Sequence, residues 1–287
     1  GLGRPLQNIA VGAAPDGKDI VSFSVYDSYG RQADAYLPFA CDASGKYLRN
    51  VAYKQDAYYK RRYGAQSTCY PFTHTVFDAA PTNRPLTTVR PGAEYRAGGG
   101  HAVECSYGVN APSELWRIEM AAALNAAGGI TVKGYHPAAT LAKSRVEDED
   151  GAVTETFTDA DGRTVLSRRV LGEGDYADTY YVYDMIGRLR WAISPEGSAR
   201  LAQGKTYALT SELAEKYCFR YKYDRNGNVC ETYIPGRDEP DMATYDDAGR
   251  LTASSTGTMR SDALSEAYRY DALGRLTAVR TKGQSTD

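Results

Sequence analysis

The chain has 287 residues, of which 42% are hydrophobic and 24% are charged, and 34 Lys and Arg against 36 Asp and Glu leave a formal net charge of −2. This composition is typical of a chain that folds around a core, as about two domains or one long repetitive one, and it excludes extensive disorder. The balanced charge supplies no concentrated positive field for phosphate backbones or anionic lipid, so we expect no nucleic-acid partner.

No membrane span is predicted either. The longest apolar window, residues 120–130, is too short and too rich in glycine, and Asn125 interrupts it. Tyrosine is in excess, with 24 Tyr against 6 Phe and 2 Trp, and together with 28 Gly this favours strands and tight turns.

The N-terminus opens inside a motif. Gly1-Leu2-Gly3-Arg4 matches the second half of a pattern that is complete at residues 26–31. No charged segment followed by an apolar core is present, so no secretory signal peptide is predicted in this chain. The abrupt opening predicts an excised fragment, with a cloning scar as the alternative origin of Gly1.

Three further segments carry helix or strand signals. Residues 51–63 (VAYKQDAYYKRRY) are the best helix candidate, with Gly64 as a C-terminal stop, and the run at 60–62 is interpreted as a solvated face rather than a ligand site. In residues 113–128 we expect a strand to about Ile118, then a short helix or loop. Residues 209–217 (LTSELAEKY) predict a short helix capped by Thr210 or Ser211.

The chain offers few groups for chemistry. Cys69 and His74 with His101 and Cys105 supply two thiols and two imidazoles that zinc could use, but the spacings fit no standard finger and ordinary packing is the favoured interpretation. The acidic run 147–150 could bind calcium, and a solvated hairpin turn between residues 143–146 and 152–157 is favoured. No hydrolase, P-loop or dinucleotide-binding motif occurs, so no cofactor, metal or catalytic residue is expected.

The five cysteines form no C-x-x-C pair. We expect them to be buried or half-buried free thiols, with one disulfide as the alternative if the protein is exported. They are Cys41, Cys69, Cys105, Cys218 and Cys230.

A motif of the form Tyr-Asp-x-x-Gly-Arg recurs along the chain. The glycines of neighbouring copies are about 25 residues apart. The exceptions are one insertion between Gly187 and Gly227 and a long gap between Gly30 and Gly162. The motif residues are Tyr26, Asp27, Gly30 and Arg31; Asp159, Gly162 and Arg163; Tyr183, Asp184, Gly187 and Arg188; Tyr223, Asp224 and Gly227; Tyr245, Asp246, Gly249 and Arg250; and Tyr270, Asp271, Gly274 and Arg275.

Each motif predicts the turn of a β-hairpin. Period-2 alternation flanks it, the aspartate can accept from the amides that follow, and the glycine can take a positive φ, which together specify a type I turn with a G1 bulge. The Asp and Arg then face each other, and their exposed ion pair, worth ~0.2–1 kcal/mol, sets strand register more than stability. The tyrosine is expected opposite the residue after the arginine, as in Tyr183 with Leu189 and Tyr245 with Leu251.

These spaced motifs resemble the RHS/YD-repeat family, most strongly from about Glu155 to Ala278. The opening Gly-Leu-Gly-Arg-Pro-Leu-Gln, the segment at 15–21 and Tyr26 to Arg31 look like the segment that precedes the repeats in RHS proteins of Bacteroides-like bacteria. The resemblance implies a mainly β fold: repeated antiparallel hairpins in a continuous curved, spiralling sheet, a YD-repeat shell segment, with two or three short helices. Residues 1–150 would form an N-terminal RHS-associated region and residues 151–287 the YD-repeat sheet.

The resemblance also implies a function. The repeats of that family form a hollow shell around a C-terminal toxin, so the expected role is a non-catalytic wall segment whose partners are the rest of its own polypeptide and that toxin. Nothing after Gly274 is similar to the self-cleaving terminal segment that many members carry, and no toxin is expected within this chain. The parent would be secreted or at the cell surface. The alternative is a surface module that binds glycans or mediates adhesion, which the tyrosine excess favours.

Overall fold

The structure is a computed structural model that describes residues 3–64, 70–95, 101–122, 128–237 and 239–255, and the backbone of 266–270 and 276–281. The chain divides into two compact units, one of residues 1–107 with 144–153 and the other of residues 108–143 with 154–287. The domain boundary expected from the repeats, between residues 1–150 and 151–287, stays a prediction. Within the described residues, no helix has the length and apolar character needed to cross a membrane.

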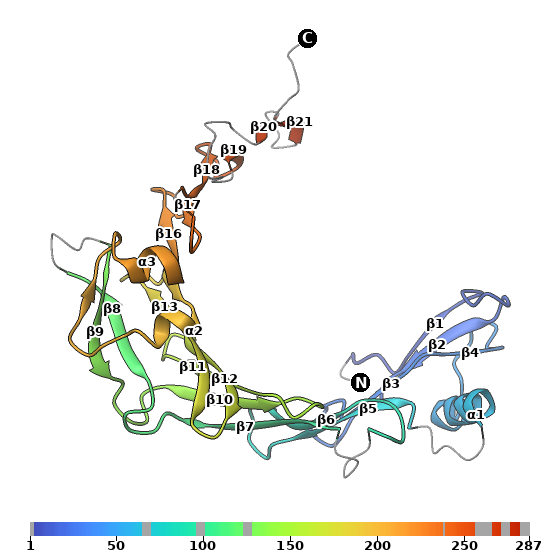
Figure 1. Ribbon diagram of the computed structural model, residues 1–287. Coiled ribbons are helices and arrows are strands. Elements are labelled where there is room, and N and C mark those ends of the chain that lie inside the picture. The colour runs from blue at the N-terminus through green and yellow to red at the C-terminus, as the bar shows by residue number, and fades with distance from the viewer. Residues whose placement is uncertain are drawn as a thin grey trace. The chain divides into compact units, whose positions relative to one another are not determined.

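The first unit combines two groups of strands with one helix (Figure 1). β1 (Gln7–Ala10), β2 (Asp19–Phe23) and β4 (Phe39–Cys41) form a three-stranded sheet in the order β1-β2-β4. A second run of hydrogen-bonded strands has the order β7-β6-β5-β3. Its strands are β3 (Asp34–Tyr36), β5 (Phe72–Phe77), β6 (Pro85–Val89) and β7 (Val103–Val109).

The core of this unit lies between the small sheet and the helix. Alternate residues of β2 are buried, and Val21 and Phe23 pack with Phe39. Helix α1 (Val51–Tyr63) has the predicted bounds, and Gly64 ends it with φ 97°, its N–H donating to the Lys60 carbonyl.

The second unit is built from a long run of strands and a small sheet beside it. The small sheet has the order β15-β9-β8, from β8 (Trp116–Met120), β9 (Ile130–Tyr135) and β15 (Thr206–Tyr207). The expected strand near Ile118 is therefore confirmed as β8. Residues 123–127, where a short helix or loop was expected to follow, lie outside the described residues.

The long run carries the repeats in one open antiparallel sheet. Its hydrogen-bonded order is β11-β12-β13-β14-β16-β17-β18-β19-β20-β21. The strands are β11 (Val153–Thr158), which follows β10 (Ala142–Glu147), then β12 (Thr164–Gly172), β13 (Asp175–Tyr183), β14 (Leu189–Ile193), β16 (Cys218–Tyr223), β17 (Val229–Tyr233), β18 (Asp241–Tyr245), β19 (Leu251–Ser255), β20 (Glu266–Tyr270) and β21 (Leu276–Thr281). The expected fold class, mainly β with repeated antiparallel hairpins and a few short helices, is confirmed.

Two short helices lie in the insertion between β14 and β16. Helix α3 (Glu212–Tyr217) is shorter than the predicted 209–217, because Ser211 rather than Thr210 caps it by accepting from the Ala214 N–H at 3.3 Å. Helix α2 (Pro195–Ser198) was not predicted. Both pack on a core in which Trp191 and Ile193 are fully buried, and the Trp191 indole donates to the Gly128 carbonyl at 2.9 Å.

Candidate functional site: the repeated hairpin turn

The turn at Asp184 shows how one motif is built. The Asp184 N–H donates to the Arg188 carbonyl at 2.9 Å, and the Gly187 N–H donates to the Asp184 carbonyl at 2.9 Å. Oδ1 of Asp184 accepts from the N–H groups of Ile186 (3.2 Å) and Arg188 (2.9 Å), and Oδ2 accepts from Nε of Arg188 at 2.8 Å. Gly187 has φ 84°, which any other residue would adopt only with strain.

The other described motifs repeat this arrangement. In each, the aspartate carboxylate accepts from the N–H groups two and four residues on, and the glycine has φ between 73° and 88°. Where the arginine is replaced, Nδ2 of Asn228 donates to Asp224 Oδ2 at 3.0 Å. Tyr270 lies in β20, and Asp271, Gly274 and Arg275 lie outside the described residues.

The pairing beside each turn has the predicted register. Tyr183 is opposite Leu189 and Tyr245 is opposite Leu251, as expected from the motif spacing. The register shifts just before each of these tyrosines, between Val182 and Tyr183 and between Thr244 and Tyr245, which is the bulge that the turn requires.

The turn environment favours the ionised aspartates. Burial alone would raise the pKa of Asp184, but the hydrogen bonds from the backbone and side chain of Arg188 outweigh it and hold the pKa below its ordinary value. At Asp246 the backbone hydrogen bond from Arg250 is the largest cause of a lowered pKa. These carboxylates are fixed acceptors rather than proton donors near neutral pH.

Two further turns of this kind were not recognised as motif copies. At Asp148, Oδ1 accepts from the N–H groups of Asp150 (3.0 Å) and Ala152 (2.8 Å), and Gly151 has φ 78°. The acidic run is therefore a hairpin turn, as favoured over calcium binding. Ala152 stands where the motif has arginine.

The second unrecognised turn is longer by two residues. Asp78 accepts from the N–H of Arg84 at 3.2 Å and from its Nε at 3.0 Å, while Asn83 has φ 52°. A search anchored on glycine misses this copy. Asparagine is the residue other than glycine that most readily adopts the left-handed region, so an Asp followed later by Asn-Arg was the available signal.

Successive turns are joined by contacts that run from one motif to the next. In the second unit, the Arg163 guanidinium lies 5.5 Å from the centroid of the Tyr183 ring, and the Tyr183 hydroxyl donates to the Thr164 carbonyl at 2.8 Å. The Arg188 guanidinium lies 4.9 Å from the Tyr223 ring, whose hydroxyl donates to the Leu189 carbonyl at 2.7 Å. In both pairs the tyrosine ring stacks under the arginine of the preceding motif. Its hydroxyl donates to the carbonyl of the residue that follows that arginine.

The first unit contains the same contacts. The Arg4 guanidinium lies over Tyr26 at 5.4 Å, and the Tyr26 hydroxyl donates to the Pro5 carbonyl at 3.0 Å. Two similar pairs lie in the described part of this unit, which are Arg31 over Phe77 at 4.9 Å and Arg84 over Tyr107 at 4.7 Å. We call these motif-to-motif contacts the arginine–tyrosine ladder, with one rung per Arg–aromatic pair.

The ladder gives some turn glycines a second reason to lack a side chain. A methyl group at Gly187 would lie 3.3 Å from Nη1 of Arg163, and one at Gly30 would collide with the Arg4 guanidinium. Gly227, by contrast, has open space around that position. The preceding arginine therefore lies on the glycine of the next turn at the Arg4–Tyr26 and Arg163–Tyr183 rungs, but not at the Arg188–Tyr223 rung.

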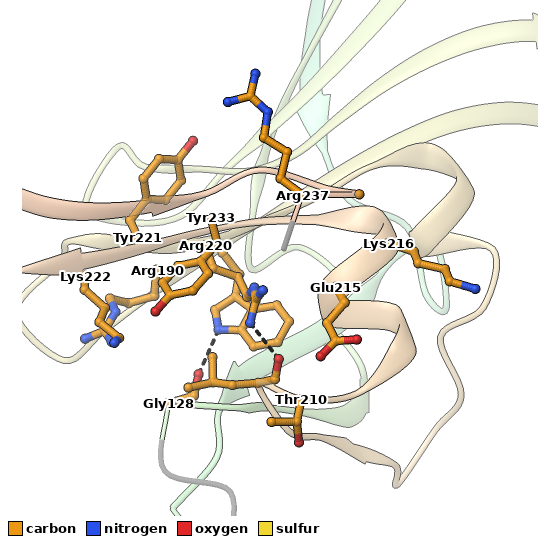
Figure 2. A pocket seen from close by; sticks show the side chains of 13 residues that line it. Gly128, Arg190, Thr210, Glu215, Lys216, Arg220, Tyr221, Lys222, Tyr233 and Arg237 are labelled. Carbon is orange, nitrogen blue, oxygen red and sulfur yellow. Dashed lines mark hydrogen bonds between the residues drawn. The ribbon is translucent and has the colours of Figure 1, made fainter. Parts of the chain in front are cut away.

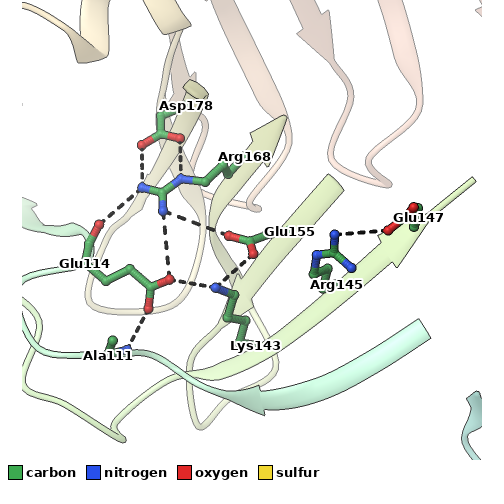
Figure 3. Close-up of polar contacts among 8 residues, drawn as sticks. All are labelled: Ala111, Glu114, Lys143, Arg145, Glu147, Glu155, Arg168 and Asp178. Carbon is green, nitrogen blue, oxygen red and sulfur yellow. Dashed lines mark hydrogen bonds and ion pairs between the residues drawn. The ribbon is translucent and has the colours of Figure 1, made fainter. Parts of the chain in front are cut away.

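A buried charge network lies beside the repeats of the second unit (Figure 3). Arg168, whose side chain is 7% exposed, forms a fork on Asp178 with both distances 2.8 Å. Nζ of Lys143 lies 2.7 Å from Glu114 and 2.9 Å from Glu155. Burial would raise the pKa of Glu114, but Lys143 and the Ala111 N–H hold it below its ordinary value. Every charge has a partner, so the network fits a structural role.

The candidate metal ligands are not brought together in the described residues. His74 pairs with Asp34 at 2.6 Å, and His101 packs edge-on against Tyr95. Cys69 lies outside the described residues, and no group of three or more His, Cys, Asp and Glu that could hold a metal is found among those described.

The described cysteines are free thiols, as expected. They are Cys41, Cys105, Cys218 and Cys230. Burial raises the pKa of Cys218 to about 12, so its thiol stays protonated near neutral pH.

Tandem hairpins joined rung by rung define a repeat protein of antiparallel β-sheet, and two family models match parts of the chain. The family model named Domain of unknown function (DUF6443) matches residues 1–109, and the model named RHS Repeat matches residues 245–286. The chain thus contains RHS repeats, as its motifs indicate. No curated protein matches it.

Two solved structures share the fold. A crystal structure of TcdB2-TccC3-TEV is 16% identical with a TM-score of 0.50, and the Tc holotoxin pore of Photorhabdus luminescens, with a TccC3 D651A mutation, is 17% identical with a TM-score of 0.54. Each match covers 94% of this chain and 11% of the other. The chain therefore spans about a ninth of the length of these structures.

Proposed function

We propose that this chain is a structural, non-catalytic segment of an RHS shell that, in a full-length parent, encloses a C-terminal toxin and helps to deliver it. Its partners are then the remainder of its own polypeptide and the toxin, and the parent is secreted or at the cell surface. The observation that carries the proposal is the ladder. The most repeated residues of the chain bind the neighbouring hairpin rather than converge on one cleft.

The electrostatics support a structural role. The turn aspartates have lowered pKa values and fixed partners, whereas a general acid or base needs a pKa near the working pH. We propose that the motif residues set strand register and hold successive hairpins at constant spacing. In a repeat protein, stability comes from such nearest-neighbour contacts.

The glycan-binding alternative stays a prediction. It rests on tyrosine side chains, and those of the ladder use their rings and hydroxyl groups within the protein. The structure adds no observation in favour of a sugar site on these residues.

Small-angle X-ray scattering of the 287-residue chain tests whether it is an open piece of wall. A compact domain of this length has a radius of gyration of roughly 19 Å. The proposal predicts a clearly larger value for the monomer. A value near 19 Å would contradict it and indicate a self-contained module.

Protease protection of the longer parent tests the enclosed toxin. The proposal predicts that the C-terminal segment resists a protease in the native protein. We expect the double variant Arg163→Ala/Arg188→Ala, which removes two rungs, to make that segment sensitive. Arg117→Ala/Arg169→Ala, which removes two exposed arginines, is the matched control. Equal cleavage of the C-terminal segment in native and denatured parent would contradict the proposal.

A further inference from the structure

A cavity of about 540 Å³ lies in the second unit, lined by residues of β14, β16, β17 and α3. Figure 2 shows Arg190, Arg220 and Lys222 gathered beside Tyr233, whereas Lys216 and Arg237 point away from them. Glu215 is the single carboxylate among the lining residues. The cavity is therefore rich in cations.

Arg220 is buried there with no carboxylate of the described residues at ion-pair distance, although Glu215 lines the same cavity. The residue is 9% exposed, its Nη1 donates to the Leu209 carbonyl at 2.6 Å, and its guanidinium lies 4.6 Å from the Tyr233 ring. Its Nε is buried and has no hydrogen-bond partner, and in the described part of the chain it forms no ion pair. Burial lowers the pKa of this guanidinium.

Arg190 also lacks a close carboxylate partner. Its nearest carboxylate oxygen, on Asp184, is 3.8 Å away, and its buried Nε also lacks a partner. Lys222 differs because it is neutralised by Glu231 at 2.7 Å. Two guanidinium groups thus carry charge into the cavity with little compensation.

The lack of a close carboxylate partner at Arg220 contrasts with the other buried arginine of the described residues. The equally buried Arg168 has a forked carboxylate partner at 2.8 Å, as a buried charge normally requires. Arginine cannot relieve the cost by losing its proton. An anion in the cavity would supply the missing counter-charge, and planar guanidinium groups favour oxyanions such as carboxylate and phosphate.

We propose that this cavity is a binding site for an oxyanion group, a phosphate or a carboxylate, held by Arg190 and Arg220. The Tyr233 ring stacks against the Arg220 guanidinium. The cavity volume leaves room for a small molecule that carries the phosphate or carboxylate. No arginine or aromatic residue of a rung lines this cavity, and the proposal does not depend on the shell function.

Titration calorimetry and thermal unfolding of the 287-residue chain test the proposal, with inorganic phosphate and acetate as separate probes and chloride at equal ionic strength as the reference. We expect saturable binding of at least one probe and a rise in Tm of about 3 °C or more at ten times its dissociation constant. Binding of phosphate alone assigns a phosphate group, acetate alone a carboxylate, and both a site for either.

Variants locate the site. Arg220→Gln and Arg190→Gln should each weaken binding by about tenfold or more, because each removes a charge-assisted contact. Arg190, with a 24% exposed side chain, is the safer variant if Arg220→Gln fails to fold. Arg117→Gln, an exposed arginine paired with Glu119, is the control and should bind as the wild type does. The proposal is overturned if neither probe binds the wild type, or if binding survives unchanged in the folded variants.

Discussion

The two units space their motifs very differently along the chain, yet they form the same rungs. In the first unit, α1 lies between the turn of Arg31 and that of Phe77, and in the second, α2 and α3 lie between the turns of Arg188 and Tyr223. Both rungs nevertheless measure 4.9 Å from guanidinium to ring. The ladder therefore depends on which hairpins are neighbours in space and tolerates inserted helices between them.

The comparison also separates the parts of a turn. Some copies of the motif have both the arginine and the aromatic ring that stacks on it, and others lack one of these parts. The copies that lack a part still form a hairpin turn. Asp148 forms its turn with Ala152 in the arginine position, and Phe77 forms a rung without a hydroxyl group. Substitutions matched across these natural variants measure what each part contributes.

The largest effect is expected from removal of the turn aspartate. Asp184→Ala loses three acceptor contacts, from Ile186 N–H, Arg188 N–H and Arg188 Nε, and should destabilise by about 2–3 kcal/mol. Asp148→Ala loses the two backbone contacts only and should cost about 1 kcal/mol less. Denaturant unfolding of both variants measures the difference, and equal costs would show that the arginine adds nothing to the turn.

The same carboxyl group sets a pH dependence. Because the folded pKa of Asp184 is lowered, its contribution to stability is complete above the unfolded pKa and is lost as the pH falls through the folded pKa. Between about pH 5 and about pH 3 the wild type should therefore lose more stability than Asp184→Asn. Parallel losses in the two proteins would contradict this assignment.

Next in size is the cost of a methyl group on a turn glycine. Gly187→Ala and Gly227→Ala both force alanine into the left-handed region, at about 1–2 kcal/mol each. Gly187→Ala should cost more, because its methyl group also presses on Arg163 at 3.3 Å, while Gly227 has open space. Thermal unfolding of the pair measures the excess, and a larger loss for Gly227→Ala would refute the second role of the glycine.

The tyrosine hydroxyl is expected to contribute about 1 kcal/mol. Tyr223→Phe keeps the ring under Arg188 and loses only the hydrogen bond to the Leu189 carbonyl at 2.7 Å. Tyr221→Phe is the matched control on the same strand, because its hydroxyl forms no hydrogen bond within the described residues. If both variants lose the same stability in denaturant, the rung hydroxyl is not what joins the hairpins.

These experiments address what the sequence predicts well and what it does not. The turns, the opposite pairing of Tyr183 and Leu189, and helix α1 follow from local signals: an Asp-to-Gly spacing, period-2 alternation and a stop glycine. Such signals act within a few residues, so a single copy of the motif carries them.

The rest depends on contacts between distant residues. A rung joins Arg188 to Tyr223, and the charge network joins Glu114 to Arg168, so neither is visible in one motif. Helix α2 has only four residues and is held by its Ser194 cap and by close packing at Gly197, which leaves no periodic signal. To predict the rungs and the charge network, one would need to know which strands are neighbours in the sheet.

The smallest expected effect comes from repairing a rung. Asn228 stands in the arginine position and bonds to Asp224 at 3.0 Å, and it lies beside Gly249 of the next turn as Arg163 lies beside Gly187. Asn228→Arg should form the in-turn ion pair and reach the ring of Tyr245, with a gain of about 0.5–1 kcal/mol. Asn226→Arg adds the same charge to an exposed position of the same turn. Since only the first variant can form a rung, a higher Tm for it than for the second attributes the gain to the ladder, and equal Tm values would reduce it to a surface charge effect.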